Sequence, residues 1–328
     1  MTTEPGIALV DLDESGVDTA FRSAVLDGLS QQQKATPARW LYDDAGSQLF
    51  EDITQLPEYY PTRAETEILS SRGEDFAAMI GEGRAVVEFG SGSSVKTPLL
   101  ISAIEPGAYV PLDISGDFLR ASAAELAAKF PGLAVYPVEA DFMRQVELPA
   151  EVGDMPKLGF FPGSTIGNMV ARTAVDLLRS MRETLGVGAQ LLIGMDLIKD
   201  EDVLVAAYDD AAGVTAEFNY NLVRRINREL GGDIPLDSLS HEARWNDENA
   251  RVEMHLVARE DIPFTVDGRP FAMAKGETIH TENSHKFNRR TSNMLLLAGG
   301  WEPQARWLDS KERFSLILAE AKPPRSAP

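Results

Sequence analysis

The sequence predicts an α/β fold in which a doubly wound, mostly parallel sheet is joined by a second, smaller α+β domain. Three observations predict it. From residue 84 to about 196, short apolar segments alternate with helical ones, which is typical of parallel strands covered by helices on both faces. The first apolar segment, residues 86–89, is followed by a Gly-Ser-Gly turn. Beyond Asp196 a helical and antiparallel region interrupts the alternation before it resumes near the C-terminus.

The first sixty residues contain few strong signals. Residues 15–30 are expected to form a helix, and the proline-flanked segment 56–61 is expected to be irregular because proline restricts the residue before it. Thr62 is a good N-cap, and Glu65 would complete a capping box for a helix that ends near residue 71.

The alternating region gives the clearest predictions. Strands are expected at 86–89, 109–112, 133–138, 158–161 and 190–194, and helices at 98–104, 117–130 and 174–185. Pro98 is tolerated in the first turn of its helix, whereas Pro131 and Gly132 end the alanine-rich one.

The remaining segments define the domain organisation. Helices are expected at 203–212 and 215–230, and antiparallel strands at 251–258 and 262–275 with a turn at Asp267-Gly268. A helix at 292–298 and strands at 304–308 and 314–320 return to the main sheet. We therefore predict a cofactor-binding domain at 64–198 plus 288–328, and a substrate-binding domain at 8–63 plus 199–287.

Composition excludes several classes of function. The 51 acidic and 31 basic side chains give a net charge of −20, which repels nucleic acid and anionic membranes and favours a small-molecule partner. No cysteine is present, so thiol nucleophiles, iron–sulfur clusters and thiolate zinc sites are excluded. The four histidines lack zinc-ligand spacing, so no metal is expected. No signal peptide or membrane-length apolar run is found, and we expect a cytoplasmic monomer.

The glycine turn indicates a nucleotide-like ligand. Gly90 and Gly92 allow the backbone to approach a ligand closely. The third glycine of the dinucleotide fingerprint would fall at position 95, where the chain has Val95. The turn therefore argues against NAD and for a ligand without a pyrophosphate, with S-adenosylmethionine the foremost candidate.

Polar side chains at the ends of the next strands fit that ligand. Asp113 ends the second strand, where a carboxylate accepts hydrogen bonds from ribose hydroxyls. Asp141 and Phe142 end the third and suit the adenine, and Lys96 could reach the ligand's carboxylate. The structural alternatives are an ordinary turn at the glycines and helix caps at the two aspartates.

Four longer segments, 40–50, 56–63, 159–168 and 208–219, resemble the histidine Nα-methyltransferase of ergothioneine biosynthesis. The resemblance covers nearly the whole chain. It implies a class I methyltransferase fold, Rossmann-like, and the transfer of three methyl groups from S-adenosylmethionine to the α-amine of L-histidine. The product would be hercynine.

The resemblance also implies roles for individual residues. Asn168 and Tyr208 would hold the substrate carboxylate, and Tyr59 would lie near the amine. Glu282 and Ser284 would bind the imidazole. The remaining substrate-pocket residues would be Tyr42, Phe50 and Met254, and the cofactor residues Gly90, Lys96, Asp113, Asp141 and Phe142.

Alternatives to these roles stay open. Met254, Tyr42 and Phe50 could be core residues, and Glu282 one more solvated acid. The sequence identifies no histidine or second carboxylate as the general base for the substrate amine. We expect the amine proton to leave to water with help from the Tyr59 hydroxyl. The rival functions are a betaine-forming methyltransferase of tryptophan or another amino acid, a nicotinamide dehydrogenase and a non-catalytic ligand sensor. An indole needs no polar pair such as Glu282 and Ser284, which disfavours the first.

Overall fold

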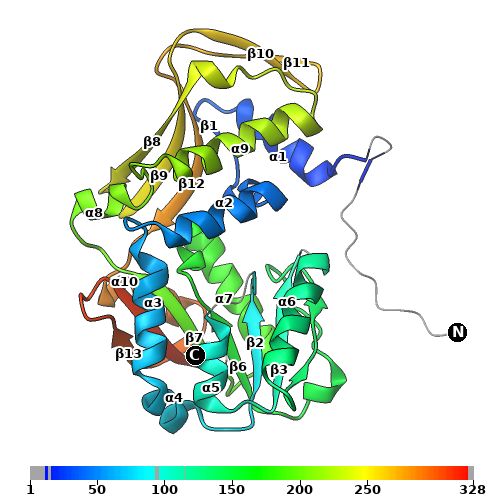
Figure 1. The fold of residues 1–328 in the computed structure, drawn as a ribbon, viewed down its shortest axis with the longest axis vertical. Helices are drawn as coiled ribbons and strands as arrows, with labels where there is room; N and C mark the ends of the chain where they lie inside the picture. The colour runs from blue at the N-terminus through cyan, green and yellow to red at the C-terminus, as the bar shows by residue number, and fades with distance from the viewer. Residues whose placement is uncertain (1–11, 14–15, 93–95, 115, 324–328) are drawn as a thin grey trace, which may run out of the picture. The chain divides into compact units, whose positions relative to one another are not determined.

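The computed structural model describes residues 12–13, 16–92, 96–114 and 116–323 (Figure 1). The chain forms two compact units. The large-sheet unit contains Pro61–Ile198 and the chain from Phe287 onward, and the small-sheet unit contains Lys199–Lys286 and the N-terminal part up to Tyr60. The predicted domain boundaries at 64, 199 and 288 lie beside these bounds. The assignment of one unit to the cofactor and the other to the substrate stays a prediction.

The large sheet has the order β13-β14-β7-β6-β2-β3-β4, with β5 also paired to β3. Every pair from β7 to β4 is parallel, whereas β14 runs antiparallel to both β7 and β13. The mostly parallel sheet confirms the predicted fold class. Its strands are β2 (Ala85–Phe89), β3 (Ala108–Asp113), β4 (Ala134–Val135), β5 (Val138–Glu139), β6 (Lys157–Phe161), β7 (Gln190–Asp196), β13 (Trp301–Leu308) and β14 (Phe314–Ala321).

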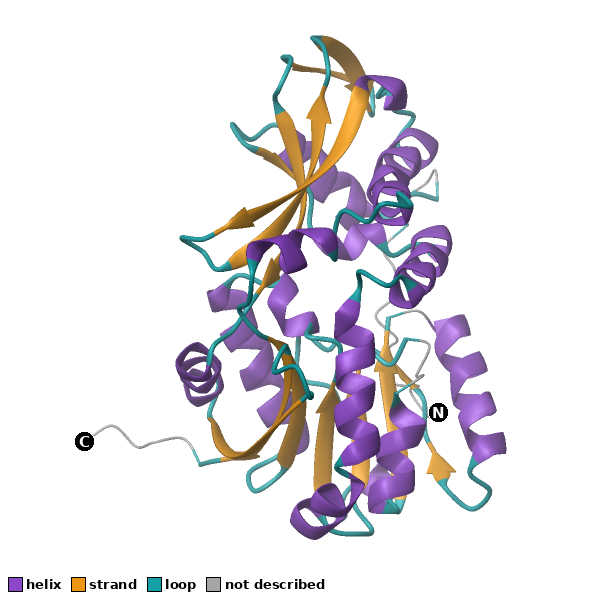
Figure 2. Cartoon of the chain, turned by 60° about the vertical axis from the view of Figure 1, so that its left-hand side comes forward, coloured by secondary structure: helices purple, strands orange, loops and turns teal. Residues whose placement is uncertain are grey.

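Helices cover both faces of this sheet (Figure 2). Successive residues of β2 point to opposite faces, so that Val87 and Phe89 belong to one buried cluster and Val86 to another. The first cluster includes side chains of α7 (Ala171–Leu185) and α10 (Arg289–Ala298). The second includes side chains of α3 (Tyr60–Ser71), α4 (Gly73–Ile80), α5 (Thr97–Ile104) and α6 (Gly116–Lys129). A sheet buried on both faces explains why its central strands are continuous apolar runs.

Two local predictions for this unit were wrong. The predicted capping box fails because α3 begins at Tyr60, before Thr62, and the Glu65 carboxylate accepts hydrogen bonds from Gly163 and Lys96 instead. The strand predicted at 133–138 is divided into β4 and β5. Pro137 lies between them and has no N–H to donate to a strand ladder.

The small-sheet unit is built on the strand order β1-β12-β9-β8. Its strands are β1 (Lys34–Ala35), β8 (Leu239–Asn246), β9 (Arg251–Ala258) and β12 (Thr278–His285). A separate hairpin, β10 (Ile262–Val266) and β11 (Arg269–Met273), turns at the predicted Asp267-Gly268, both of which have positive φ. The sequence analysis did not predict β8 and β12, because both are rich in polar residues.

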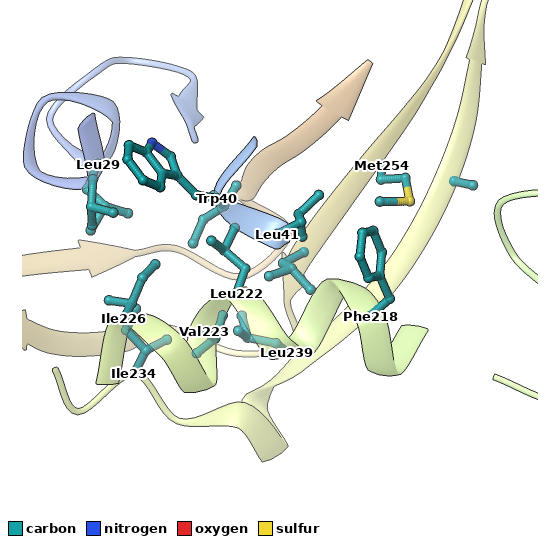
Figure 3. Close-up of a cluster of buried hydrophobic side chains, with 14 of the residues drawn as sticks. Leu29, Trp40, Leu41, Phe218, Leu222, Val223, Ile226, Ile234, Leu239 and Met254 are labelled. Carbon is teal, nitrogen blue, oxygen red and sulfur yellow. The ribbon is translucent and has the colours of Figure 1, made fainter. Parts of the chain in front are cut away.

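Helices and one apolar cluster complete this unit. The cluster, drawn in Figure 3, joins Trp40 and Leu41 of a 3-10 turn to Leu222 of α9 and Met254 of β9. The unit's helices are α1 (Thr19–Leu29), α2 (Asp44–Gln55), α8 (Glu201–Ala206) and α9 (Val214–Glu229). The 3-10 turns of the chain are η1 (Ala38–Leu41), η2 (Ala150–Val152), η3 (Thr165–Asn168) and η4 (Leu236–Ser238). No helix in the described part of the chain is long and apolar enough to cross a membrane.

Candidate active site

The glycine turn lies where the order of the large sheet reverses. From β2 the chain proceeds to β3 on one side, and later to β6 on the other, which is the position at which open α/β sheets bind ligands. Gly90 has φ +71° and its N–H donates to the Leu112 carbonyl at 2.9 Å. Gly92 has φ +44°, and nothing lies within 4 Å of where a Cβ would be. Ser93, Ser94 and Val95 lie outside the described residues.

Two of the predicted cofactor residues are in contact with this turn. Asp113, at the end of β3, accepts a hydrogen bond from the Gly92 N–H at 3.3 Å. The Phe142 ring lies beside Gly90, where a Cβ would come within 3.4 Å of it. The Asp141 carboxylate is exposed and accepts a hydrogen bond from the Met143 N–H. An open glycine turn, a carboxylate and an aromatic face fit a nucleoside with ribose hydroxyls.

Lys96 is paired with a buried carboxylate that the sequence analysis assigned to a helix cap. Its Nζ lies 2.5 Å from Glu65 Oε2. Glu65 is fully buried, and it also accepts a hydrogen bond from the Gly163 N–H at 2.9 Å. The pair thus connects α3 with the segments that follow β2 and β6. Sequence spacing gave no signal for this contact, since the partners are far apart along the chain.

A second buried carboxylate stabilises the start of α5. Glu88 of β2 accepts hydrogen bonds from Thr97 Oγ1 at 2.7 Å and Tyr109 Oη at 2.5 Å. Burial raises the pKa of Glu88 to about 7, and the two hydrogen bonds partly oppose that rise. Glu88 therefore has a structural role: it connects β2 with α5 and β3 next to the glycine turn.

Asn168 is positioned by a tight turn after β6. Gly163 and Ser164 both have positive φ, and Ser164 Oγ accepts a hydrogen bond from the Asp196 N–H at 2.9 Å. The turn leads into η3, whose last residue is Asn168. Asn168 is half-buried and follows the carboxyl end of β6, at the same sheet edge as the glycine turn.

The aromatic residues predicted for the substrate pocket form one cluster in the small-sheet unit. Tyr42 and Phe50 meet edge to face with ring centroids 5.5 Å apart, and Phe50 lies 6.0 Å from Tyr59. Tyr59 in turn lies 6.1 Å from Tyr208. Phe218, which was not predicted as a site residue, has its ring 5.3 Å from that of Tyr42. Phe218 lies within one of the quoted family segments, which was the available signal.

The register between β9 and β12 brings the predicted imidazole-site residues together. Glu282 is the cross-strand partner of Met254, just after a shift in register between His280 and Glu282. Glu282 and Ser284 are two residues apart, so they project from the same face of β12, and both are buried.

The Glu282 carboxylate is buried and has a raised pKa. Burial raises its pKa to about 7, against the opposing effect of Lys286. Among the described residues its Oε2 atom has no hydrogen-bond partner. The pKa of Tyr42 is raised well above its ordinary value. Burial is the largest cause, and electrostatic interactions with Glu282, Tyr59 and Tyr208 add to the rise. The carboxylate and the aromatic cluster therefore share one low-dielectric environment.

Lys286 is a functional candidate that was not predicted from the sequence. It follows Glu282 and Ser284 at the same two-residue spacing and is only 3% exposed. Its Nζ donates to Ser284 Oγ at 2.8 Å and to Tyr208 Oη at 2.9 Å. The alternation along β12 was the signal that could have identified it.

His255 and His280, which the sequence analysis treated as scattered, stack with ring centroids 4.7 Å apart. With Glu253 they form a group that could hold a metal ion. Both nitrogens of His255 make hydrogen bonds within the protein, one with Glu253 and the other with Thr278. Glu253 is also paired with Arg251, so these side chains form a hydrogen-bonded network within the sheet.

Comparison with known proteins gives the family. The model of the histidine-specific, S-adenosylmethionine-dependent methyltransferases matches residues 21–321. The chain belongs to this family. It is 39% identical over 306 residues to a histidine Nα-methyltransferase from Mycolicibacterium smegmatis, covering 92% of this chain and 94% of that one.

More distant relatives of this methyltransferase have other names. An ergothioneine biosynthesis protein from Neurospora crassa is 28% identical over 298 residues, covering 87% of this chain and 33% of that protein. An L-tryptophan methyltransferase from Psilocybe serbica is 27% identical over 355 residues, covering 97% and 98%. Proteins similar to this methyltransferase thus include one named for a different amino-acid substrate.

Proposed function

We propose that this methyltransferase transfers three methyl groups from S-adenosylmethionine to the α-amine of L-histidine, giving hercynine for ergothioneine biosynthesis. The observation that carries the choice of substrate is the buried Glu282 carboxylate beside the aromatic cluster. A carboxylate in such a site selects a ligand that can donate a hydrogen bond to it. Imidazole offers that N–H, and phenyl does not.

The proposal assigns the methyl donor to the glycine turn of the large-sheet unit. Gly90 and Gly92 would admit the ligand to the backbone, Asp113 would accept from its ribose hydroxyls, and Asp141 with Phe142 would bind its adenine. Lys96 would face its carboxylate while paired with Glu65. S-adenosylmethionine supplies a sulfonium methyl that is already activated for transfer.

The proposal assigns histidine to Asn168 and to residues of the small-sheet unit. Asn168 and Tyr208 would donate hydrogen bonds to its carboxylate. Glu282 would accept from the imidazole N–H, with Ser284 as its neighbour and Met254 against the ring. Tyr42 and Phe50 would provide aromatic faces for the increasingly methylated ammonium, which is attracted to the ring quadrupole.

The protein's contribution to catalysis would be orientation and control of one proton. Holding the amine nitrogen in line with the methyl group converts a bimolecular encounter into a unimolecular step. The amine must be unprotonated for each transfer, and burial among aromatic rings lowers an ammonium pKa. Tyr59, which is 7% exposed within this cluster, is the residue proposed to help that proton reach water.

The setting of the enzyme is also part of the proposal. A cytoplasmic location would fit the absence of cysteine, which is compatible with a reducing compartment, and the monomeric state stays a prediction. The net charge of −20 supports a small-molecule substrate in place of nucleic acid or an anionic membrane.

Product analysis with a mixture of all twenty amino acids and S-adenosylmethionine tests the proposal. Mass spectrometry should find a gain of three methyl groups on histidine alone. Methylation of tryptophan in preference to histidine would favour the rival betaine-forming activity and would overturn the role of Glu282. Tight cofactor binding without turnover of any amino acid would indicate a ligand sensor.

A further inference from the structure

A buried ammonium group contacts two of the residues proposed to bind histidine, Tyr208 and Ser284. Lys286 is 3% exposed, and its Nζ lies 4.6 Å from the centre of the Tyr208 ring. It donates hydrogen bonds to Tyr208 Oη at 2.9 Å and Ser284 Oγ at 2.8 Å. These two oxygens are themselves only 2.7 Å apart. The three groups therefore form a closed triangle of hydrogen bonds.

The chemistry of an ammonium group constrains the other two corners. Lysine has three donors and no acceptor, so both hydroxyl oxygens must accept from it. Each hydroxyl must then direct its own proton away from Lys286. Between Tyr208 and Ser284, a single proton supplies the 2.7 Å bond, so one hydroxyl donates within the pair and the other donates elsewhere. The lysine thus sets the direction of hydrogen bonding at both positions.

Lys286 also acts on the Glu282 carboxylate, four residues earlier in the sequence. Glu282, Ser284 and Lys286 project from one face at successive two-residue steps. The positive charge favours the ionised form of Glu282, against the desolvation that favours the neutral form. The charged group that acts on Glu282 is Lys286, the residue just after β12, and Glu282 in turn acts on the Tyr42 hydroxyl.

We propose that Lys286 is a positioning residue of the histidine site, which orients the hydroxyls of Tyr208 and Ser284 and keeps Glu282 ready to accept the imidazole N–H. This inference rests on the proposed function. It assigns Lys286 no contact with the reacting atoms, since its hydrogen bonds act through its neighbours. Strand β12 ends at His285. The backbone of Lys286 is nevertheless held in place, because its N–H donates a hydrogen bond to the Ala250 carbonyl at 2.8 Å.

The test compares Lys286→Met with Lys286→Arg and with Lys275→Met, which removes an exposed lysine of the same unit. Hydrogen bonds to a charged group are worth enough to change affinity by about tenfold or more. We expect Lys286→Met to raise the KM and the calorimetric Kd for L-histidine by about tenfold. The KM for S-adenosylmethionine should change less than about threefold, and Lys286→Arg should recover part of the loss. Lys275→Met should match the unsubstituted enzyme.

A pH profile separates positioning from simple structural support. With Lys286→Met, the acidic limb of kcat/KM for histidine should move to higher pH, and this shift should vanish in a Glu282→Gln background. A folded Lys286→Met protein with unchanged histidine affinity would overturn the inference. Equal losses for histidine and S-adenosylmethionine with no shift of the acidic limb would also overturn it.

The inference and the proposed function fail in different ways. If the unsubstituted chain neither binds nor methylates histidine, the proposed function fails and the inference falls with it. If it does both and Lys286→Met does not differ from Lys275→Met, only the inference fails. If Lys286→Met does not fold, Lys286→Gln takes its place, because it also removes the charge. The same rise in the KM for histidine and the same shift of the acidic limb are then expected, and their absence overturns the inference.

Discussion

Replacing Glu282 with glutamine should make the protein more stable and a poorer enzyme. The pKa of Glu282 is raised from 4.5 to about 7, chiefly by burial. The folded state therefore binds this proton more tightly than the unfolded chain does. The destabilisation is absent below about pH 4.5, grows as pH rises toward 7, and is complete above that. Glutamine keeps the shape without the charge and removes the effect.

The magnitude follows from the size of the shift. One pKa unit corresponds to about 1.4 kcal/mol, so the ionised side chain costs about 3 kcal/mol at about pH 8. Urea unfolding should show that Glu282→Gln raises the free energy of unfolding by nearly that value at about pH 8, and by almost nothing at about pH 4. In the pH range where Glu282→Gln is more stable than the unsubstituted protein, it should also bind histidine more weakly.

Glu253→Gln is the matched control on the neighbouring strand. Burial alone would raise the pKa of Glu253, but hydrogen bonds from Arg251, His255 and Asn246 outweigh it and hold the value at about 2. This carboxylate stabilises the fold above about pH 4.5, and the stabilisation is lost as pH falls toward 2. Its substitution should therefore destabilise at about pH 8. A loss of stability from Glu282→Gln at that pH, equal in sign to the control, would refute the reasoning.

Three further predictions concern turnover, selectivity and the cofactor. Tyr59→Phe should lower kcat by about tenfold with less than about threefold change in KM for histidine, as steady-state kinetics would show, and unchanged kcat would remove Tyr59 from the chemistry. Glu282→Ala should narrow the preference for histidine over phenylalanine by about tenfold or more in competition assays, and an undiminished preference would defeat its assignment. Gly90→Ala and Gly186→Ala should each cost about 1 kcal/mol of stability, because both glycines have positive φ. Only Gly90→Ala should weaken S-adenosylmethionine binding in calorimetry, and equal affinities in the two variants would contradict the glycine-turn site.

The main sheet could be predicted because its signals are local. Apolar runs such as those of β2 and β7, buried on both faces, stand out in the sequence and alternate with helical segments. Gly90, Asp113 and Phe142 could be located in the same way, since each lies at or shortly after the end of a strand. The family resemblance then supplied the residues of the small-sheet unit.

What could not be predicted depends on contacts distant in sequence. Strand β12 has a polar sequence because its inward side chains form a polar site, so the usual alternation of apolar residues is absent. Glu65 matched a capping box, but a fully buried carboxylate is stabilised more by Lys96 and the Gly163 N–H than by its own helix end. Lys286 was overlooked because a lysine is rarely buried. Its role is evident only once Tyr208 and Ser284 are seen beside it.

The most direct test of the central claim is the position of the transferred methyl groups. S-adenosylmethionine labelled with carbon-13 in its methyl group should be incubated with the enzyme and L-histidine labelled with nitrogen-15 at the α-amine. NMR of the product should show one trimethylammonium resonance coupled to the labelled amine, and no methyl on the imidazole. Methyl groups on a ring nitrogen, or an unmodified histidine beside consumed cofactor, would contradict the account.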